Sequence, residues 1–348
     1  MKKYIAISIL CLSMFFSACD NFLDVVPKVQ SVLNSTSDYL GLIEEIDPCY
    51  DMENFWYMAN EVCNYNMPLL DVYQYPLQSI SFFWDEEKSR YEYTESSELY
   101  NYCYARIAKY NVVISNIDDA EGPSEDKILG KAQARIMRAY NNFFLVNTYA
   151  KFYDKNTAEA DNGIILHEEL NLESTSKQYS VAEVYNSIER DITAALPGLP
   201  ERAASALRPD KYFGYALKAK VHLYKGEIDS ALNAGLNALK SDYHKLWDMP
   251  ALYTQLVSEF PFLPSSPSMW VMYVSRAIDA PESLLFQFGL NQFSPSPSYV
   301  RKPIIDLYDK NSDLRYIMCF AYYMPDRPTA EVGAVAMMVS CLSMKALM

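Results

Sequence analysis

The sequence holds few of the residues on which most catalytic centres depend. Only three histidines occur in 348 residues, His167, His222 and His244. None of them belongs to an H-E-x-x-H metal motif, and the chain has neither a G-x-S-x-G turn nor a glycine-rich phosphate loop. These absences argue against zinc proteases, serine hydrolases and P-loop enzymes. We therefore expect a protein without catalytic residues, metal ligands or cofactors.

Carboxylates are the one catalytic group in good supply. A glycoside hydrolase needs two of them flanking the scissile bond, and the segments WDEEK (84–88) and HEEL (167–170) offer acidic pairs. The chain carries 44 aspartates and glutamates, however, so such pairs arise easily. Acidic runs of this kind are usually solvated surface charge. They do not change the expectation that the protein is not an enzyme.

Positive charge is scarce. Thirty basic side chains face 44 acidic ones, for a net charge of −14. Nucleic-acid binding requires clustered lysine and arginine that release counterions, and adsorption to an anionic bilayer has the same requirement. The composition argues against both and leaves neutral or cationic partners open.

The N-terminus has the three parts of a secretory signal. Lys2 and Lys3 provide the positive start, Ile5–Phe16 the apolar run, and small residues precede Cys19. The run is too short to span a bilayer as a helix. We expect residues 1–18 to be a signal peptide that is removed on export.

The order Phe-Ser-Ala-Cys at 16–19 resembles a bacterial lipobox, in which the cysteine is acylated and becomes the first mature residue. Phe16 departs from the usual leucine, and an ordinary signal peptide with an incidental cysteine is the alternative. Several acyl chains on one residue would give the stable anchoring that a single chain does not. We expect lipidation of Cys19 and a lipid anchor.

The remaining cysteines do not form a recognisable framework. No C-x-x-C pair occurs, so neither a zinc site nor a disulfide scaffold is indicated. We expect buried free thiols for most of them, with one disulfide left open after export. Once Cys11 and Cys19 are accounted for, an odd number is left: Cys49, Cys63, Cys103, Cys319 and Cys341.

Helical periodicity dominates the middle of the chain. Apolar residues at helical spacing predict helices over 97–117 and 128–153. Ser180 and Glu183 form a capping box that opens a helix over 180–200, closed by Pro197 and Gly198.

The flanking regions give weaker signals. A shorter helix is expected from Tyr39, capped by Ser37 or Asp38. Residues 60–95 and 243–300 lack a period and predict loops, and 301–320 returns to helical spacing.

Residues 208–242 predict two helices broken at Lys225-Gly226. Small residues lie where the helices would cross, as in one tetratricopeptide-type unit. His222 falls inside the first helix, where an aromatic residue is usual, and is interpreted as a packing position. Residues 98–150 form a plausible diverged second pair. The small positions are Ala219, Gly226, Ala231 and Ala238.

The loops contain the candidate ligand-binding residues. An aromatic ring can cover the apolar face of a sugar while amides and carboxylates take its hydroxyls. Asn64, Asn66, Asp71 and Gln74 supply such polar groups near the aromatics of 60–75. With 29 tyrosines and 16 phenylalanines, most aromatic residues are core or scattered surface, which is the alternative for each candidate. The candidates are Tyr65, Tyr73, Tyr75, Trp84 and Trp270.

Several segments, taken in order, resemble the SusD/RagB nutrient-binding lipoproteins of Bacteroidetes. They are CDNFLDVVP after the lipobox, YARIAKYNVVISNI, AQARIMRAYNNFFLVNTYAKFY, YSVAEVYNSIERDITAALPGLP, RPDKYFGYALKAKVHLYKGEIDSALNAGLNAL and IIDLYDKNSDLRYIMCF. The resemblance runs from residue 17 to about residue 320, nearly the whole chain.

The resemblance implies an all-α fold of tetratricopeptide-like helix pairs with long irregular loop insertions. It implies one domain over 19–348, with its repeat helices at about 98–153 and 180–242. Family members are not enzymes; they bind oligosaccharides, less often peptides, at the outer membrane and deliver them to a SusC-type TonB-dependent transporter. Members continue beyond AVAMMVSCLSMKALM, so we expect the C-terminal part of the family domain to be missing. The alternatives are a peptide-binding and a purely scaffolding repeat lipoprotein.

Overall fold

The structure is a computed structural model. It describes residues 33–43, 63–65, 80, 83–93, 97–168, 177–204, 208–242, 244, 248–259, 298–300, 302–309, 311–314, 320–323 and 334–337. The predicted signal peptide and Cys19 lie outside these residues.

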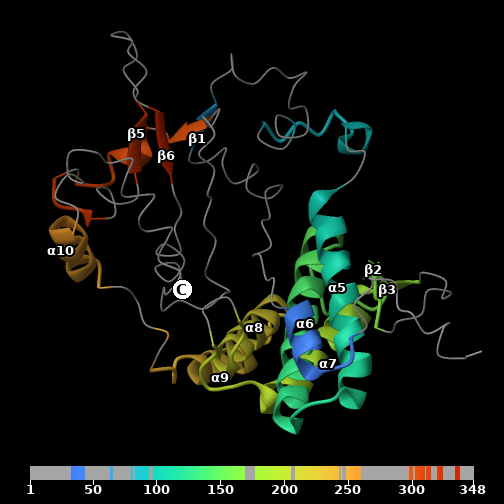
Figure 1. Ribbon diagram of the computed structural model, residues 1–348. Helices are drawn as coiled ribbons and strands as arrows, with labels where there is room; N and C mark the ends of the chain where they lie inside the picture. Colours follow the sequence, from blue (N-terminus) through green and yellow to red (C-terminus); the bar gives the residue numbers. More distant parts are fainter. Residues whose placement is uncertain are drawn as a thin grey trace, which may run out of the picture.

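Helices make up most of the described chain, which confirms the all-α fold class. α5 (Glu98–Asn116), α6 (Ser124–Tyr149) and α7 (Val181–Ala195) lie side by side, with α6 in contact with both others (Figure 1). The short α2 (Thr36–Leu42) packs on α5 and α6. Three-residue 3₁₀ turns, η4 (Ile117–Asp119) and η5 (Leu196–Gly198), follow α5 and α7.

The hydrophobic core lies between these three helices. On α5 the buried positions recur every three or four residues, so one stripe faces α6. α6 is buried on a wide face because α5, α7 and α8 all contact it. Cys103 forms no disulfide and is fully buried in this core, as expected of a structural cysteine. The α5 stripe consists of Leu99, Cys103, Ile107, Tyr110, Val113 and Ile117.

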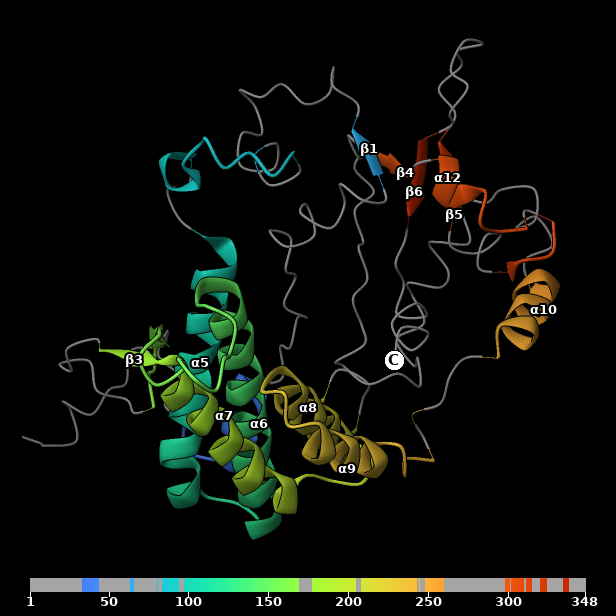
Figure 2. The same cartoon turned by 180° about the vertical axis from the view of Figure 1, so that it is seen from behind.

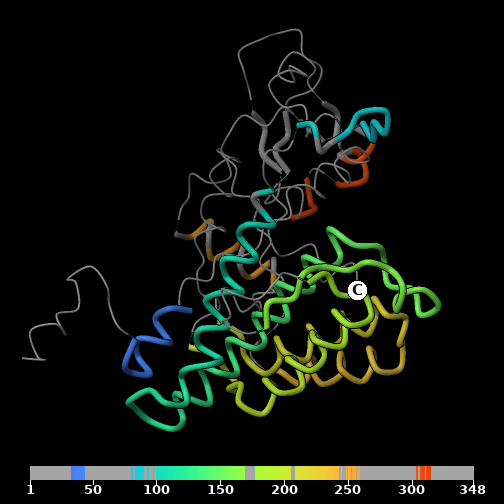
Figure 3. The backbone as a smooth tube through the Cα atoms, turned by 90° about the vertical axis from the view of Figure 1, so that its right-hand side faces the viewer, coloured from blue at the N-terminus to red at the C-terminus, as the bar shows by residue number. Residues whose placement is uncertain are grey.

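The predicted repeat unit is confirmed as α8 (Lys211–Tyr224) and α9 (Ile228–Ala238), which run side by side (Figure 3). Gly226 closes α8 with φ of 75°, a conformation that glycine adopts without strain. A Cβ built on Gly235, which is not among the predicted small positions, would lie 4.0 Å from that of Ala219, so a small residue faces Ala219 where the helices cross. Seen from behind, the pair packs beside α6 and α7 (Figure 2).

Helix boundaries follow their capping residues. The capping box predicted for α7 is present, with Ser180 as N-cap and Glu183 at the third position. The start predicted for α2 was wrong by three residues: Ser35 is the N-cap, and Asp38 closes a second capping box. α6 begins and ends four residues earlier than predicted, since its first turn follows Pro123.

Two regions predicted as loops contain regular structure. α10 (Met249–Glu259) lies within 243–300, where the Asp248 carboxylate accepts a hydrogen bond from the Ala251 amide at the helix start. Within 60–95 there are a strand, β1 (Cys63–Tyr65), and a 3₁₀ turn, η3 (Arg90–Tyr93). Propensity alone does not reveal elements as short as β1 and η3, because pairing with a partner strand or local hydrogen bonds decide them.

Of the helix expected over 301–320, the described residues contain α12 (Lys302–Ile305) and a helical residue at 314, with turns at 306–308 and 311–312 between them. The Asp309 carboxylate accepts the amide of Asn311, a local turn that competes with helical hydrogen bonds. A strand, β5 (Phe320–Tyr323), follows and pairs with β6 (Ala334–Met337).

The described strands form three two-stranded antiparallel sheets, and β5–β6 is one of them. β1 pairs with β4 (Ser298–Val300), and β2 (Asn162–Ile165) pairs with β3 (Gln178–Ser180) at the start of α7. No helix among the described residues is long and apolar enough to cross a membrane.

Candidate functional site

Two of the five candidate ligand-binding residues fall within the described chain. Trp84 is exposed, and Tyr65 ends strand β1. Tyr73, Tyr75 and Trp270 lie outside the described residues. The described residues therefore do not test whether the five candidates lie together, and their assignment remains a prediction.

Trp84 combines an exposed side chain with an unusual backbone conformation. Its backbone φ is 54°, in the left-handed region that bulky side chains rarely adopt. The residue is 57% exposed, beside Phe83 at 47%. A strained backbone that holds an indole outward is found more often at binding sites than elsewhere.

Tyr65 connects two loop segments that are distant in sequence. β1 and β4 are antiparallel, with Tyr65 opposite Ser298 and Asn64 opposite Tyr299. Residues 63–65 thus lie beside residues 298–300. This pairing is invisible in the sequence, because neither segment alternates over enough residues to indicate a strand.

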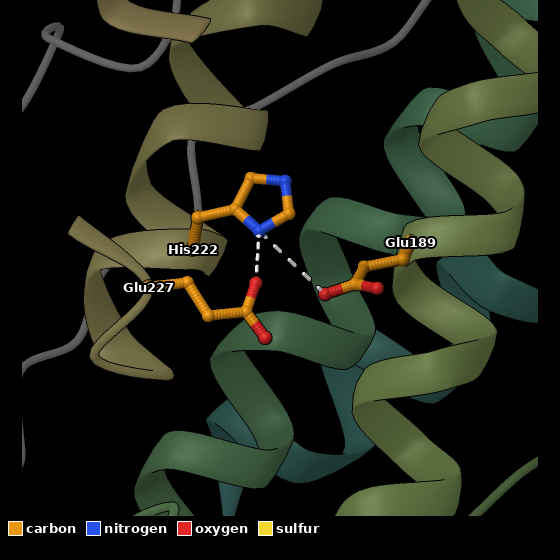
Figure 4. A group of neighbouring side chains, drawn as sticks. All are labelled: Glu189, His222 and Glu227. Atoms are coloured by element: carbon orange, nitrogen blue, oxygen red, sulfur yellow. Dashed lines mark hydrogen bonds and ion pairs between the residues drawn. The ribbon is translucent and has the colours of Figure 1, made fainter. Parts of the chain in front are cut away.

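A charged cluster joins α7 to the α8–α9 pair. His222 on α8 lies with its Nδ1 2.6 Å from Glu227 Oε2 and 3.9 Å from Glu189 Oε1 (Figure 4). Glu189 projects from α7, and Glu227 is the N-cap residue of α9. One ligand atom from each of the three residues falls within 4.8 Å of the others, a spacing that a divalent cation could bridge.

Lys225 already supplies the positive charge of this cluster. Its Nζ lies 2.6 Å from Glu189 Oε1 and 2.8 Å from Glu227 Oε1, and its side chain is 9% exposed. Burial alone would lower the pKa of Lys225, but hydrogen bonds to both glutamates raise it. Burial would likewise raise the pKa of Glu227, yet its bonds with Lys225 and His222 lower it.

The four groups are therefore an ion-pair network that holds α7 against the repeat unit. A metal ion would have to displace an ammonium that both carboxylates already bind. The sequence placed His222 at a packing position, and at 12% side-chain exposure it is largely buried between helices.

A second polar network lies between α5, α6 and α7. Arg138 donates from Nε and Nη2 to the two carboxylate oxygens of Asp191, both at 2.7 Å. Its Nη1 donates to Asn111 Oδ1 at 2.7 Å and to the Glu168 carbonyl at 3.1 Å. All its partners are satisfied acceptors, so this buried network fixes the helix packing.

The sequence did contain a signal for this network. Asp191 falls at helical spacing from Val184 and Ile188, the apolar stripe of α7. A carboxylate on a buried stripe requires a cationic or hydrogen-bonding partner. The partner itself, Arg138, lies on a different helix 53 residues away and could not be identified from spacing.

The outer face of α9 is apolar and exposed. Its residues recur every three or four positions, so they share one side of the helix. Their exposure ranges from 55% to 77%, which is unusual for a stripe of this length on a helix. We call this set the α9 face: Ile228, Leu232, Leu236 and Leu239.

Comparison with known proteins identifies the fold. A family model described as SusD-like, starch-binding and associating with the outer membrane matches residues 21–223, more than half of the chain. Among curated proteins, no significant match to the sequence was found.

Solved structures show the same fold. A SusD superfamily protein from Bacteroides vulgatus is 15% identical to this chain and superimposes with a TM-score of 0.60. The match covers 89% of this chain and 69% of that protein. A candidate sugar-binding protein of that organism is 17% identical, with a TM-score of 0.57. The match covers 88% of this chain and 71% of that protein.

A SusD-like carbohydrate-binding protein from Bacteroides vulgatus is 16% identical, with a TM-score of 0.54. The match covers 83% of this chain and 61% of that protein, so this chain spans less than two thirds of its length. The helical architecture built on α5 to α9 and the family match agree: the chain belongs to the SusD-like family.

Proposed function

We propose that this protein is a surface-exposed outer-membrane lipoprotein that captures oligosaccharides and delivers them to a SusC-type TonB-dependent transporter. The observation that carries the proposal is the family match over residues 21–223, with its description as starch-binding and associated with the outer membrane. Acylation of Cys19 would supply the anchor. The protein would bind glycans without turning them over.

Sugar capture requires exposed aromatic rings near polar side chains. Trp84 fits this requirement by its exposure and backbone geometry. Tyr65, Tyr73, Tyr75 and Trp270 complete the proposed ligand set. Rings that cover a sugar face tolerate several sugars, so the polar groups around them would set the preference.

Docking on a transporter requires an exposed surface on the rigid helical part. The α9 face provides an apolar stripe on the repeat unit. In the sequence, this stripe is separate from the loops that contain the aromatic candidates. Burial of leucines against a partner contributes about 25 cal/mol per Å² of apolar surface removed from water. The transporter is the partner that this proposal assigns to the face.

A glycan panel tests the proposal against its alternatives. The purified mature protein is titrated with starch, other neutral polysaccharides and oligosaccharides, and with peptides, while released sugars are assayed. Saturable glycan affinity without released product is the expected result. Turnover would establish a glycoside hydrolase, peptide affinity alone a peptide-binding protein, and binding of neither a scaffold.

A further inference from the structure

Lys220 on α8 differs from the other buried lysine nearby. Lys225, five residues later, is neutralised by two glutamates. Lys220 is partly buried, yet no carboxylate in the described part of the chain forms an ion pair with it. Burial lowers the pKa of its ammonium, with no opposing contribution from an acid. A desolvated charge without a counter-ion is costly in the free protein.

Two aromatic rings lie near this ammonium. Its Nζ lies 6.0 Å from the ring centroid of Phe143 and 6.0 Å from that of Tyr224. Tyr224 is one helical turn after Lys220, so both point from the same side of α8. At these distances the rings give the ammonium at most a weak cation–π attraction.

A third ring extends the aromatic surface to solvent. Phe152, just after α6, lies 6.0 Å from Tyr224 between ring centroids, with the planes 37° apart. Tyr224 in turn packs edge-on against Phe143 at 5.0 Å. Phe152 is 67% exposed, so a large apolar ring is open to solvent beside the half-buried ring of Tyr224 and an ammonium that no described carboxylate pairs with.

We propose that Phe152, Tyr224 and Lys220 form a subsite for an acidic sugar, a hexuronic acid residue of a glycan. The sugar ring lies on Phe152, and its carboxylate accepts a hydrogen bond from Lys220 Nζ. Such a charge-assisted bond supplies the counter-ion that the described residues do not provide. The inference rests on the proposed glycan binding and adds a ligand class and a location on the helices, apart from the loop aromatics.

Charge makes this location selective. The chain carries 14 more acidic than basic side chains, so a uronate is repelled by most of its surface. The Lys220 ammonium beside the exposed ring of Phe152 offsets that repulsion locally. A neutral sugar gains the ring contact but not the ion pair.

The test compares trigalacturonate with its methyl ester, which has the same rings without the charge. Calorimetric titration of the mature protein should show the acid binding about tenfold or more tightly than the ester, the effect of one hydrogen bond to a charged group. Lys220→Met should reduce the affinity for trigalacturonate to the affinity for its methyl ester. Lys218→Met, two residues away on another side of α8, should leave the preference unchanged. Phe152→Ala should weaken both ligands.

The inference is overturned if the acid binds no better than the ester, if neither binds, or if Lys220→Met retains the preference. Neutral oligosaccharides titrated in the same series separate this failure from that of the proposed function. Binding of neutral glycans with no uronate preference would leave the proposed function standing and remove the subsite. Thermal unfolding of each variant shows whether a loss of binding comes from a loss of fold.

Discussion

Arg138 and Asp191 are joined by two parallel hydrogen bonds of 2.7 Å across the interface of α6 and α7. Both side chains are more than nine-tenths buried. A bidentate pair of this kind fixes the relative position of two helices, because both bonds hold in only one register. The rigid frame on which the proposed binding surfaces lie therefore depends on it.

Asp191→Ala should destabilise the protein by about 3–5 kcal/mol, because it leaves a buried guanidinium without its carboxylate. Chemical denaturation followed by circular dichroism measures the loss. Lys211→Ala, which removes an exposed ion pair with Glu201, is the control and should change stability little. Equal effects of the two substitutions would show that the buried pair does not fix the frame.

Ser180→Ala should cost about 1 kcal/mol, since Ser180 caps α7 and binds the Glu183 amide at 3.2 Å. In return the Ser180 amide donates to the Glu183 carboxylate, which lowers the pKa of Glu183. The stability that the ionised Glu183 carboxylate contributes is complete above the ordinary pKa of glutamate. It is lost as the pH falls through the lowered pKa of Glu183. Glu183→Gln should therefore destabilise at pH 7 but have little effect at pH 3. A pH-independent effect in denaturant titrations would contradict this explanation.

Trp84→Ala should weaken glycan binding and leave the melting temperature nearly unchanged, because the residue is 57% exposed. Trp84→Gly should also relieve about 1 kcal/mol of backbone strain at φ 54°. Tyr93→Ala removes another exposed aromatic, 46% exposed and outside the proposed ligand set, and serves as the control. Unchanged affinity in the Trp84 variants, measured on the glycan that binds best, would remove Trp84 from the site.

Cys19→Ser should release the protein from membranes, because a serine has no thiol to acylate. Fractionation of cells that express each form, followed by immunoblotting, measures the distribution. Cys11→Ser lies inside the predicted signal and is the matched control, expected to stay membrane-bound. A Cys19→Ser protein that remains in the membrane fraction would show that the anchor is not at Cys19.

Leu232→Ser with Leu236→Ser should abolish association with the transporter while the protein stays folded, since both side chains are more than half exposed. Asn233→Ser, an exposed position between them, is the control. Co-purification of the transporter with each variant from solubilised membranes is compared after matching expression. Equal recovery would place the docking surface elsewhere.

The helices that could be predicted are those whose signals are local. α7 has a capping box at Ser180 and a Pro-Gly stop, and α8 ends at a glycine with positive φ. The β1–β4 pair could not be predicted, because each strand has three residues and is fixed by its partner more than 230 residues away.

The sites divide in the same way. The His222 packing position followed from its place in the repeat helix, whereas its contacts with Glu189 and Glu227 depend on how three helices meet. The Lys220 subsite required ring positions from α6 and α8 that no motif records. Composition gave too many aromatic candidates, since exposure, not residue type, separates Trp84 from the buried rings.

The measurement that tests the central proposal most directly is a pull-down of the tagged full-length protein from detergent-solubilised native outer membranes, with mass spectrometry of everything recovered. We predict recovery of a large TonB-dependent barrel of the SusC type together with the protein, and an intact mass that shows acylated Cys19. Recovery of an unacylated protein without a transporter would contradict the proposal.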